Sequence, residues 1–182
     1  MPPSADEAPD PAAARVRPAI VALASIAFIA SQANLLRIVG PLTPSILALQ
    51  LAFTPDAFTD VLSRWGEAGI ARYREHFAYD MAHPFIYGAL GVAWVRWSGL
   101  FAALPSWRRR AWTVALPVAG ACDLVENALH WTLLGSAGAI TAFPVALAAT
   151  AASVKWGLAV LFAAGLVRRL VAAAFASAAS RV

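Results

Sequence analysis

Ionisable and polar side chains recur at helical spacing in two otherwise apolar parts of the chain. The first set comprises Asp80, His83, Pro84 and Tyr87, and the second comprises Asp123, Glu126, Asn127 and His130. Offsets of three, four and seven residues, at 100° per residue, keep each set on a single stripe of a helix. The spacing therefore predicts two helices with one polar face each, and two antiparallel neighbours would bring these faces together.

The carboxylates of the second set need a partner if their helix lies in a membrane. An ionisable side chain in hydrocarbon costs about 2.5 to 3.5 kcal/mol on insertion scales. Lys155, the single lysine among 14 basic residues, lies in a later apolar run at a depth similar to that of Asp123. A buried ammonium can lose its proton, whereas a guanidinium effectively cannot. We expect Lys155 to pair with Asp123 or Glu126, either as a static ion pair or as part of a proton-exchanging site.

These residue types favour acid or base chemistry on a hydrophobic molecule. Carboxyl groups in a medium of low dielectric constant are suited to general acid or base catalysis. The candidate catalytic residues are Asp123, Glu126, His130 and Lys155. The candidate ligand-binding residues are Asp80, His83, Tyr87 and Asn127. The predicted function is a polar pocket within the membrane that binds a lipid or small hydrophobic ligand, with acid or base catalysis left open.

Two other functions remain open at this stage. His83 and His130, with Asp80 and Glu126, would offer two nitrogen and two oxygen ligands to a metal ion. The pattern of two Glu-x-x-His pairs found in di-metal helix bundles is not met, so the metal and any other cofactor stay unknown. Alternatively, the chain is a small transporter or accessory subunit in which the polar stripe serves only helix packing.

Each of these residues also has a purely structural interpretation. Pro84 would kink its helix, and Tyr87 and Asn127 would form hydrogen bonds between helices. Asp80 would cap the start of its helix. His76 is interpreted as an exposed loop histidine.

The composition places these stripes in a membrane protein. Of the 182 residues, 60% are hydrophobic and 13% are charged, and the mean hydropathy is +0.66. A soluble domain is about 45 to 50% apolar and about 25% charged. The net charge of +4 does not indicate a nucleic-acid partner, because the basic residues lie at predicted membrane edges. One cysteine, Cys122, excludes an internal disulfide.

The pattern predicts an all-α fold, a four-helix transmembrane bundle with an additional interfacial helix. Residues 1–14 are predicted to be a disordered tail, 15–170 a single transmembrane domain, and 171–182 a C-terminal tail. The predicted spans are 18–36, 78–101, 111–134 and 144–166. Between the first two spans in the chain, an amphipathic helix over 55–74 would lie at the membrane–water interface. Residues 38–55 are predicted to be re-entrant or interfacial. The first apolar run also fits a cleaved signal peptide.

The arginines and the single lysine predict the orientation. With four spans, eight basic residues fall on the side of the termini and four on the other side. Because basic residues favour the cytoplasmic side, both termini are predicted to be cytoplasmic, in a bacterial inner membrane. The polar stripes then lie in the outer half of the membrane. The oligomeric state cannot be predicted.

One stretch resembles known proteins. The region from Leu49 to His130 contains the run WGEAGIARY, the Asp80, Pro84 and Tyr87 spacing, and the Asp123-Leu-Val-Glu126-Asn127 element. It resembles small four-span bacterial membrane proteins of uncharacterised activity. By architecture alone, a four-helix bundle with intramembrane carboxylates is similar to the EXPERA-type sterol isomerases and sterol-binding proteins. The first resemblance implies no activity, and the second assigns no role to any residue.

Overall fold

The computed structural model describes residues 11–179, and in this range the chain forms helices and no strand. The elements in chain order are α1 (Pro11–Val39), α2 (Ile46–Gln50), α3 (Pro55–Asp80), α4 (His83–Trp97), α5 (Ser106–Gly135), the 3-10 turn η1 (Ala137–Ala139) and α6 (Ala142–Ala179). The predicted all-α class is confirmed. The predicted N-terminal tail lies outside the described residues up to residue 10, and α1 begins within it at Pro11. Most of the predicted C-terminal tail continues α6, and residues 180–182 lie outside the described residues.

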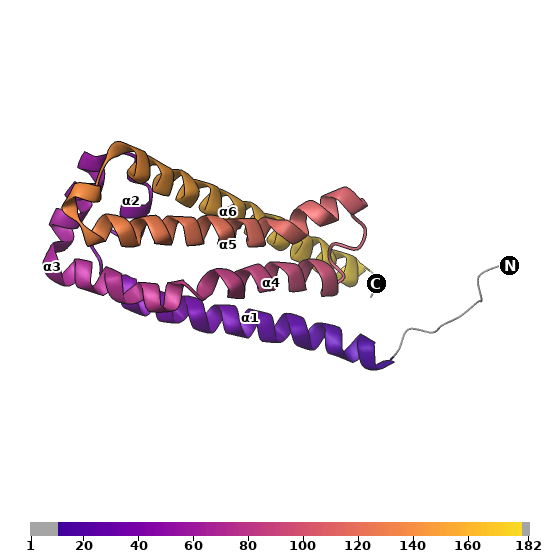
Figure 1. Cartoon of the computed structure of the whole chain (residues 1–182). Helices are drawn as coiled ribbons and strands as arrows, with labels where there is room; N and C mark the ends of the chain where they lie inside the picture. Colours follow the sequence, from indigo (N-terminus) through magenta and orange to yellow (C-terminus); the bar gives the residue numbers. More distant parts are fainter. Residues whose placement is uncertain (1–10, 180–182) are drawn as a thin grey trace.

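The long helices run side by side along one axis (Figure 1). The strongest contacts join α1 to α4, α4 to α5, and α5 to α6. The start of α1 and the end of α6 lie at one end of the molecule, and α2 with most of α3 lies at the other. Both ends of the described chain are therefore at the same end of the helix assembly.

Two described helices are long and apolar enough to cross a membrane, namely residues Arg17–Val39 of α1 and Ala142–Ala179 of α6. Length and hydropathy therefore do not confirm the four-span bundle. Helix α4 has 15 residues, fewer than the roughly 20 that cross the hydrocarbon core. Helix α5 has 30 residues, but its polar stripe and three arginines reduce its hydropathy.

The predicted helix over 78–101 is divided in the structure. Helix α3 ends at Asp80 and α4 begins at His83, with a turn at residues 81–82 between them. Pro84, in the first turn of α4, has no N–H to donate, and its ring clashes with the carbonyl four residues earlier in a continuous helix. Pro84 therefore separates two helices where the sequence predicted one kinked helix.

Helix α3 starts as the sequence predicts but follows a different path. The backbone N–H of Ala57 donates to Thr54 Oγ1 at 3.2 Å, and Pro55 is the first helical residue. Gly66 then breaks the helix, because its φ of 61° lies in the left-handed region that favours glycine. The predicted interfacial helix over 55–74 is instead part of a longer, bent helix that buries Phe58 and Trp65.

Two arginines of α3 attach it to the ends of other helices. Arg72 Nη1 donates to the carbonyl of Ile38 at 3.1 Å, and Arg74 Nη2 donates to the carbonyl of Leu134. These acceptors lie in the last turns of α1 and α5, where carbonyls have no partner within their own helix. Helix α3 therefore closes one end of the assembly.

The buried side chains form two apolar clusters with a polar layer between them. The first apolar cluster includes Ile38, Leu49, Phe58, Trp65, Leu133 and Val145. The second includes Val95, Phe101, Leu116, Ala119 and Phe162. Along α5, the buried polar residues follow Leu116 and Ala119 and precede Leu133, so they lie between the two clusters.

Helices α4 and α5 approach closely because glycines face the contact. A Cβ atom on Gly120 would lie 3.0 Å from the carbonyl oxygen of Pro84, and one on Gly91 would lie 2.8 Å from Leu116 Cβ. Larger side chains would push the helices apart, which fixes the distance across which the polar layer forms.

Candidate functional site

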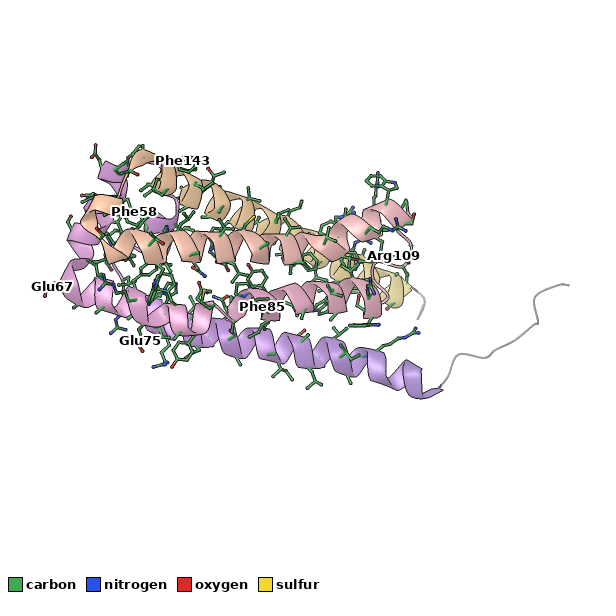
Figure 2. The ribbon with its side chains drawn as sticks, in the orientation of Figure 1. Phe58, Glu67, Glu75, Phe85, Arg109 and Phe143 are labelled. Atoms are coloured by element: carbon green, nitrogen blue, oxygen red, sulfur yellow. The ribbon has the colours of Figure 1, made fainter. Side chains whose placement is uncertain are left out.

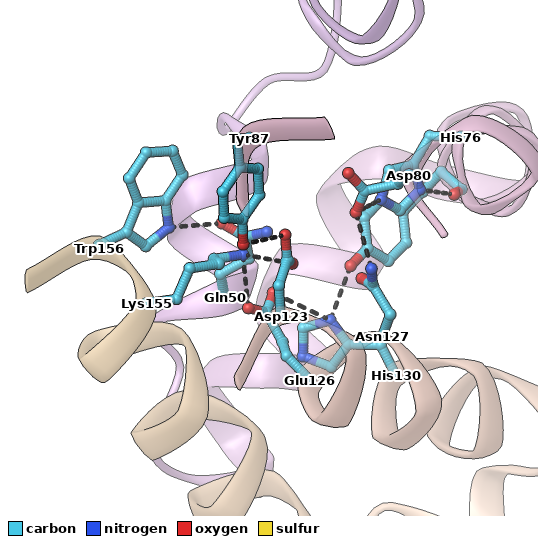
Figure 3. A network of polar contacts seen from close by, with 11 residues as sticks. Gln50, His76, Asp80, Tyr87, Asp123, Glu126, Asn127, His130, Lys155 and Trp156 are labelled. Carbon is cyan, nitrogen blue, oxygen red and sulfur yellow. Dashed lines mark hydrogen bonds and ion pairs between the residues drawn. The ribbon is translucent and has the colours of Figure 1, made fainter. Parts of the chain in front are cut away.

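Lys155 of α6 lies between two carboxylates of α5 (Figure 3). Its Nζ is 3.0 Å from Asp123 Oδ1 and 2.6 Å from Glu126 Oε2. The side chain of Lys155 is 8% exposed, that of Asp123 is 4% exposed, and that of Glu126 is 0% exposed. The predicted ion pair is confirmed, with the difference that Lys155 contacts both carboxylates. If Lys155 paired with only one carboxylate, the other would be left as a free acid or base. Here both carboxylates are paired with Lys155.

Asp123 also binds α4. The hydroxyl of Tyr87 donates to Asp123 Oδ2 at 3.1 Å, so both oxygens of this carboxylate have a partner. The two polar stripes therefore face each other as predicted, and Tyr87 and Asp123 form one contact between them. Asp123 of α5 therefore joins α4 through Tyr87 and α6 through Lys155.

Asn127 of α5 connects the layer to α3. Its Nδ2 donates to Asp80 Oδ2 at 2.9 Å, and His76 Nε2 lies 3.4 Å from the same oxygen. Asp80 is buried at the end of α3, so the prediction that it caps a helix start is wrong. No side chain caps α4, whose preceding residue is Ala82. The interpretation of His76 as an exposed loop residue is also wrong, since it lies within α3 and is 1% exposed.

His130 is held by Tyr73, a second residue of α3. The Tyr73 hydroxyl lies 2.6 Å from His130 Nδ1, and Glu126 Oε1 lies 3.9 Å from the same nitrogen. The phenol and the imidazole ring therefore share a buried hydrogen bond that joins α3 to α5.

Sequence reasoning assigned no role in a site to three residues of this layer, which are Gln50, Tyr73 and His76. Gln50 Oε1 accepts from Trp156 Nε1 at 3.0 Å, and the Trp156 ring lies 5.3 Å from Lys155 Nζ. Tyr73 lies on the apolar face of the predicted 55–74 helix. A buried tyrosine hydroxyl needs a hydrogen-bond partner, and this was the available signal.

His83 lies on the α1 side of α4, where its Nδ1 is 2.8 Å from Ser31 Oγ. Its ring stacks on Phe28 at a centroid distance of 5.6 Å and meets Tyr87 edge-on. His83 and His130 thus bind different helices. Among the described residues, no three His, Cys, Asp or Glu side chains form a group that could hold a metal ion.

The carboxyl groups of the polar layer outnumber its single lysine. Asp80, Asp123 and Glu126 contribute up to three negative charges, whereas Lys155 contributes one positive charge. Two histidines also lie beside these carboxyl groups. His76 is 3.4 Å from Asp80, and His130 is 3.9 Å from Glu126. Uncompensated charges are costly in a medium of low dielectric constant. The layer is therefore suited to holding protons and passing them between neighbouring groups.

Comparison with known protein families, curated proteins and solved structures finds no match for this chain. The chemistry of the site is accordingly argued from its own residues and their contacts.

Proposed function

We propose that the chain is an integral membrane protein that crosses the membrane four times, through α1, the end of α3 with α4, α5, and α6. The outer faces of α1 and α6 support this, because Ile26, Ile29 and Val160 are more than 60% exposed. Exposed apolar faces of this length favour contact with lipid.

The distribution of arginine supports an inner-membrane location with both termini in the cytoplasm. The ends of the described chain lie together in Figure 1, at the end where Arg108, Arg109 and Arg110 begin α5. Arg64, Arg72 and Arg74 belong to α3, which lies mostly at the opposite end. The larger number of basic residues on the side of the termini favours the cytoplasm there.

We further propose that the polar layer binds a lipid or small hydrophobic ligand and exchanges a proton with it. The observation that carries this proposal is Lys155 shared between Asp123 and Glu126, with a third carboxylate, Asp80, in the same layer. Because carboxylates outnumber ammonium groups, a proton held in the layer is available for transfer. Glu126 and Asp123 would exchange it, and Lys155 would set the balance between them.

The remaining residues have supporting roles in this proposal. His130 lies beside Glu126 and would assist it, and Tyr73 fixes the His130 ring against α3. Tyr87, His83, Asp80 and Asn127 would contact the ligand. Tyr87 and His83 lie on α4 near its contact with α1, so a ligand in the lipid would reach Asp123 by separating α1 from α4.

The test combines infrared spectroscopy with analysis of bound molecules. Purified protein at pH 7 should show the C=O stretch of a protonated carboxyl group, and Glu126→Gln or Asp123→Asn should remove or shift this band. Untargeted mass spectrometry should find a hydrophobic molecule that copurifies with the parent and with the control variant Arg64→Gln, but not with these variants. Absence of both signals would refute the proposal.

A second candidate function follows from the inaccessibility of the layer. Glu126, Asn127 and His130 are each at most 1% exposed, as expected for residues that only fix helix packing in a transporter or accessory subunit. In that case Glu126→Gln would change stability while the copurifying molecules stayed the same.

A further inference from the structure

A basic cavity of about 460 Å³ lies at the end of the molecule opposite the first apolar cluster. Three helices contribute to its wall: α1 near its start, α4 near its end, and α5 in its first turns. The residues that matter for its chemistry are Arg17, Arg96, Trp97, Arg109, Arg110 and Thr113. Figure 2 shows Arg109 at this end of the molecule and Glu67 at the other.

The charge of this cavity is of one sign. Four guanidinium groups from three helices line it, and none of its described lining residues is Asp or Glu. The ion pairs of the described residues do not include these four arginines. Like charges that converge in a concave site repel each other and concentrate anions there.

The preference for arginine at the cytoplasmic edge explains the sign of this charge but not its convergence. An arginine that only marks orientation can extend into water at any position around a helix. Arg108 is an arginine of this kind. It is exposed, its guanidinium lies over the Trp107 ring at 5.0 Å, and it does not line the cavity. Arg96, Arg109 and Arg17 instead approach one space from separate helices.

We propose that this cavity binds a phosphate group. Guanidinium groups match phosphate oxygens with paired hydrogen bonds, and several of them can share one phosphate. The volume lies in the range of about 300 to 1,000 Å³ that is common for small-ligand sites. The phosphate can belong to the headgroup of an anionic phospholipid or to a soluble phosphate compound, and the experiment distinguishes these sources.

The experiment uses the full chain in lipid nanodiscs and in detergent. The first probe is phosphatidylglycerol, whose retention by the protein is measured by native mass spectrometry against phosphatidylcholine. The second probe is inorganic phosphate, whose binding is measured by calorimetry in detergent. The test variant is Arg96→Gln with Arg109→Gln. The control variant is Arg108→Gln with Arg168→Gln, which removes the same charge from residues outside the cavity wall.

We expect the test variant to lose about tenfold or more in affinity for one of the probes, as the loss of charge-assisted hydrogen bonds predicts. The control variant should lose clearly less. Loss confined to phosphatidylglycerol assigns the site to a lipid headgroup, and loss of inorganic phosphate binding assigns it to a soluble compound. Arg96→Lys with Arg109→Lys keeps the charge but not the paired hydrogen bonds and should fall between parent and test variant.

Equal losses in the test and control variants would overturn the proposal, because they would show attraction to the basic surface as a whole. The proposal would also be overturned if the parent neither retained phosphatidylglycerol more strongly than phosphatidylcholine nor bound inorganic phosphate. The substituted arginines are exposed, so the variants should fold, and an unchanged thermal midpoint for each checks this.

Discussion

Replacing Lys155 with methionine tests whether the polar layer depends on its ammonium. Lys155→Met keeps the length and most of the volume of the side chain and removes the positive charge shared by Asp123 and Glu126. The two carboxylates then face each other in a buried site without a cation. We expect strong destabilisation.

The magnitude follows from the further proton that a carboxylate must take up when the ammonium is removed. A carboxyl group with an ordinary pKa of about 4 is protonated at pH 7 at a cost of about 4 kcal/mol, since each pH unit contributes about 1.4 kcal/mol. This agrees with the loss of about 3 to 5 kcal/mol that follows the breaking of a buried ion pair. At pH 5 the same protonation costs only about 1.4 kcal/mol.

The sign of the pH dependence follows from proton uptake. The folded variant holds a proton that its unfolded state has released at neutral pH. The stability of Lys155→Met should therefore fall as the pH rises from 5 to 7, relative to the parent.

The free energy of unfolding can be measured in mixed detergent micelles. Tryptophan fluorescence reports unfolding, and the reaction of the single cysteine, Cys122, with a maleimide provides a second signal. Arg64→Met is the matched control, because Arg64 pairs with Asp60 at 2.9 Å with side chains 63% and 55% exposed. Its loss should be at most about 1 kcal/mol.

Combining Lys155→Met with Glu126→Gln or Asp123→Asn should restore part of the loss, because each substitution removes one of the unpaired carboxylates. The double substitution of both carboxylates should restore more than either one. If Lys155→Met unfolds like the parent and couples to neither carboxylate, the ammonium is solvated, and the argument for a buried, charge-sharing site is refuted.

Three further substitutions test the contacts around this ion pair. Tyr73→Phe should cost about 1 to 3 kcal/mol, because a buried ring nitrogen loses its hydrogen-bond partner, and thermal unfolding measures this loss. Asn127→Asp should cost at least about 2 kcal/mol at pH 7 and less at pH 5, since it places a carboxylate against Asp80; equal losses at both pH values would contradict this. Gly120→Leu should destabilise by about 1 to 3 kcal/mol through overpacking, whereas Gly157→Leu, where a Cβ atom meets nothing within 4 Å, should change stability little.

The helical class was predictable from the sequence because apolar and polar residues repeat with the period of a helix. The path of α3 was not. Its bend depends on the left-handed backbone of Gly66, and a glycine in an amphipathic pattern does not specify its own dihedral angles. The division at residues 81–82 had a local signal in Pro84, but a proline in a membrane helix is compatible with either a kink or an end.

The centre of the site was predictable because burial in an apolar helix leaves carboxylates few possible partners, and the chain has one lysine. The contribution of α3 was missed for a different reason. Tyr73 and His76 lie in a segment whose amphipathic pattern is equally typical of a surface helix, and only tertiary packing decides between the two. His83 was grouped with His130 by spacing, whereas Ser31 and Phe28 of α1 are its partners in the structure.

The hydrogen bond between Tyr87 and Asp123 offers a test of the proposed ligand route between α1 and α4. The Tyr87 hydroxyl donates to Asp123 Oδ2 at 3.1 Å, and the other oxygen of Asp123 pairs with Lys155 at 3.0 Å. Because Asp123 keeps its ion pair when Tyr87 is removed, Tyr87→Phe should cost only about 1 kcal/mol, within the range for one intramolecular hydrogen bond.

The same substitution should affect ligand binding more than stability. A ligand arriving between α1 and α4 would pass His83, whose ring contacts Ser31 of α1 and Tyr87, and would then meet the Tyr87 hydroxyl before Asp123. Mass spectrometry should find less copurifying hydrophobic molecule with Tyr87→Phe than with Tyr73→Phe, although Tyr73→Phe is the less stable protein. The opposite order would show that ligand loss follows stability alone, and would place the entrance elsewhere than between α1 and α4.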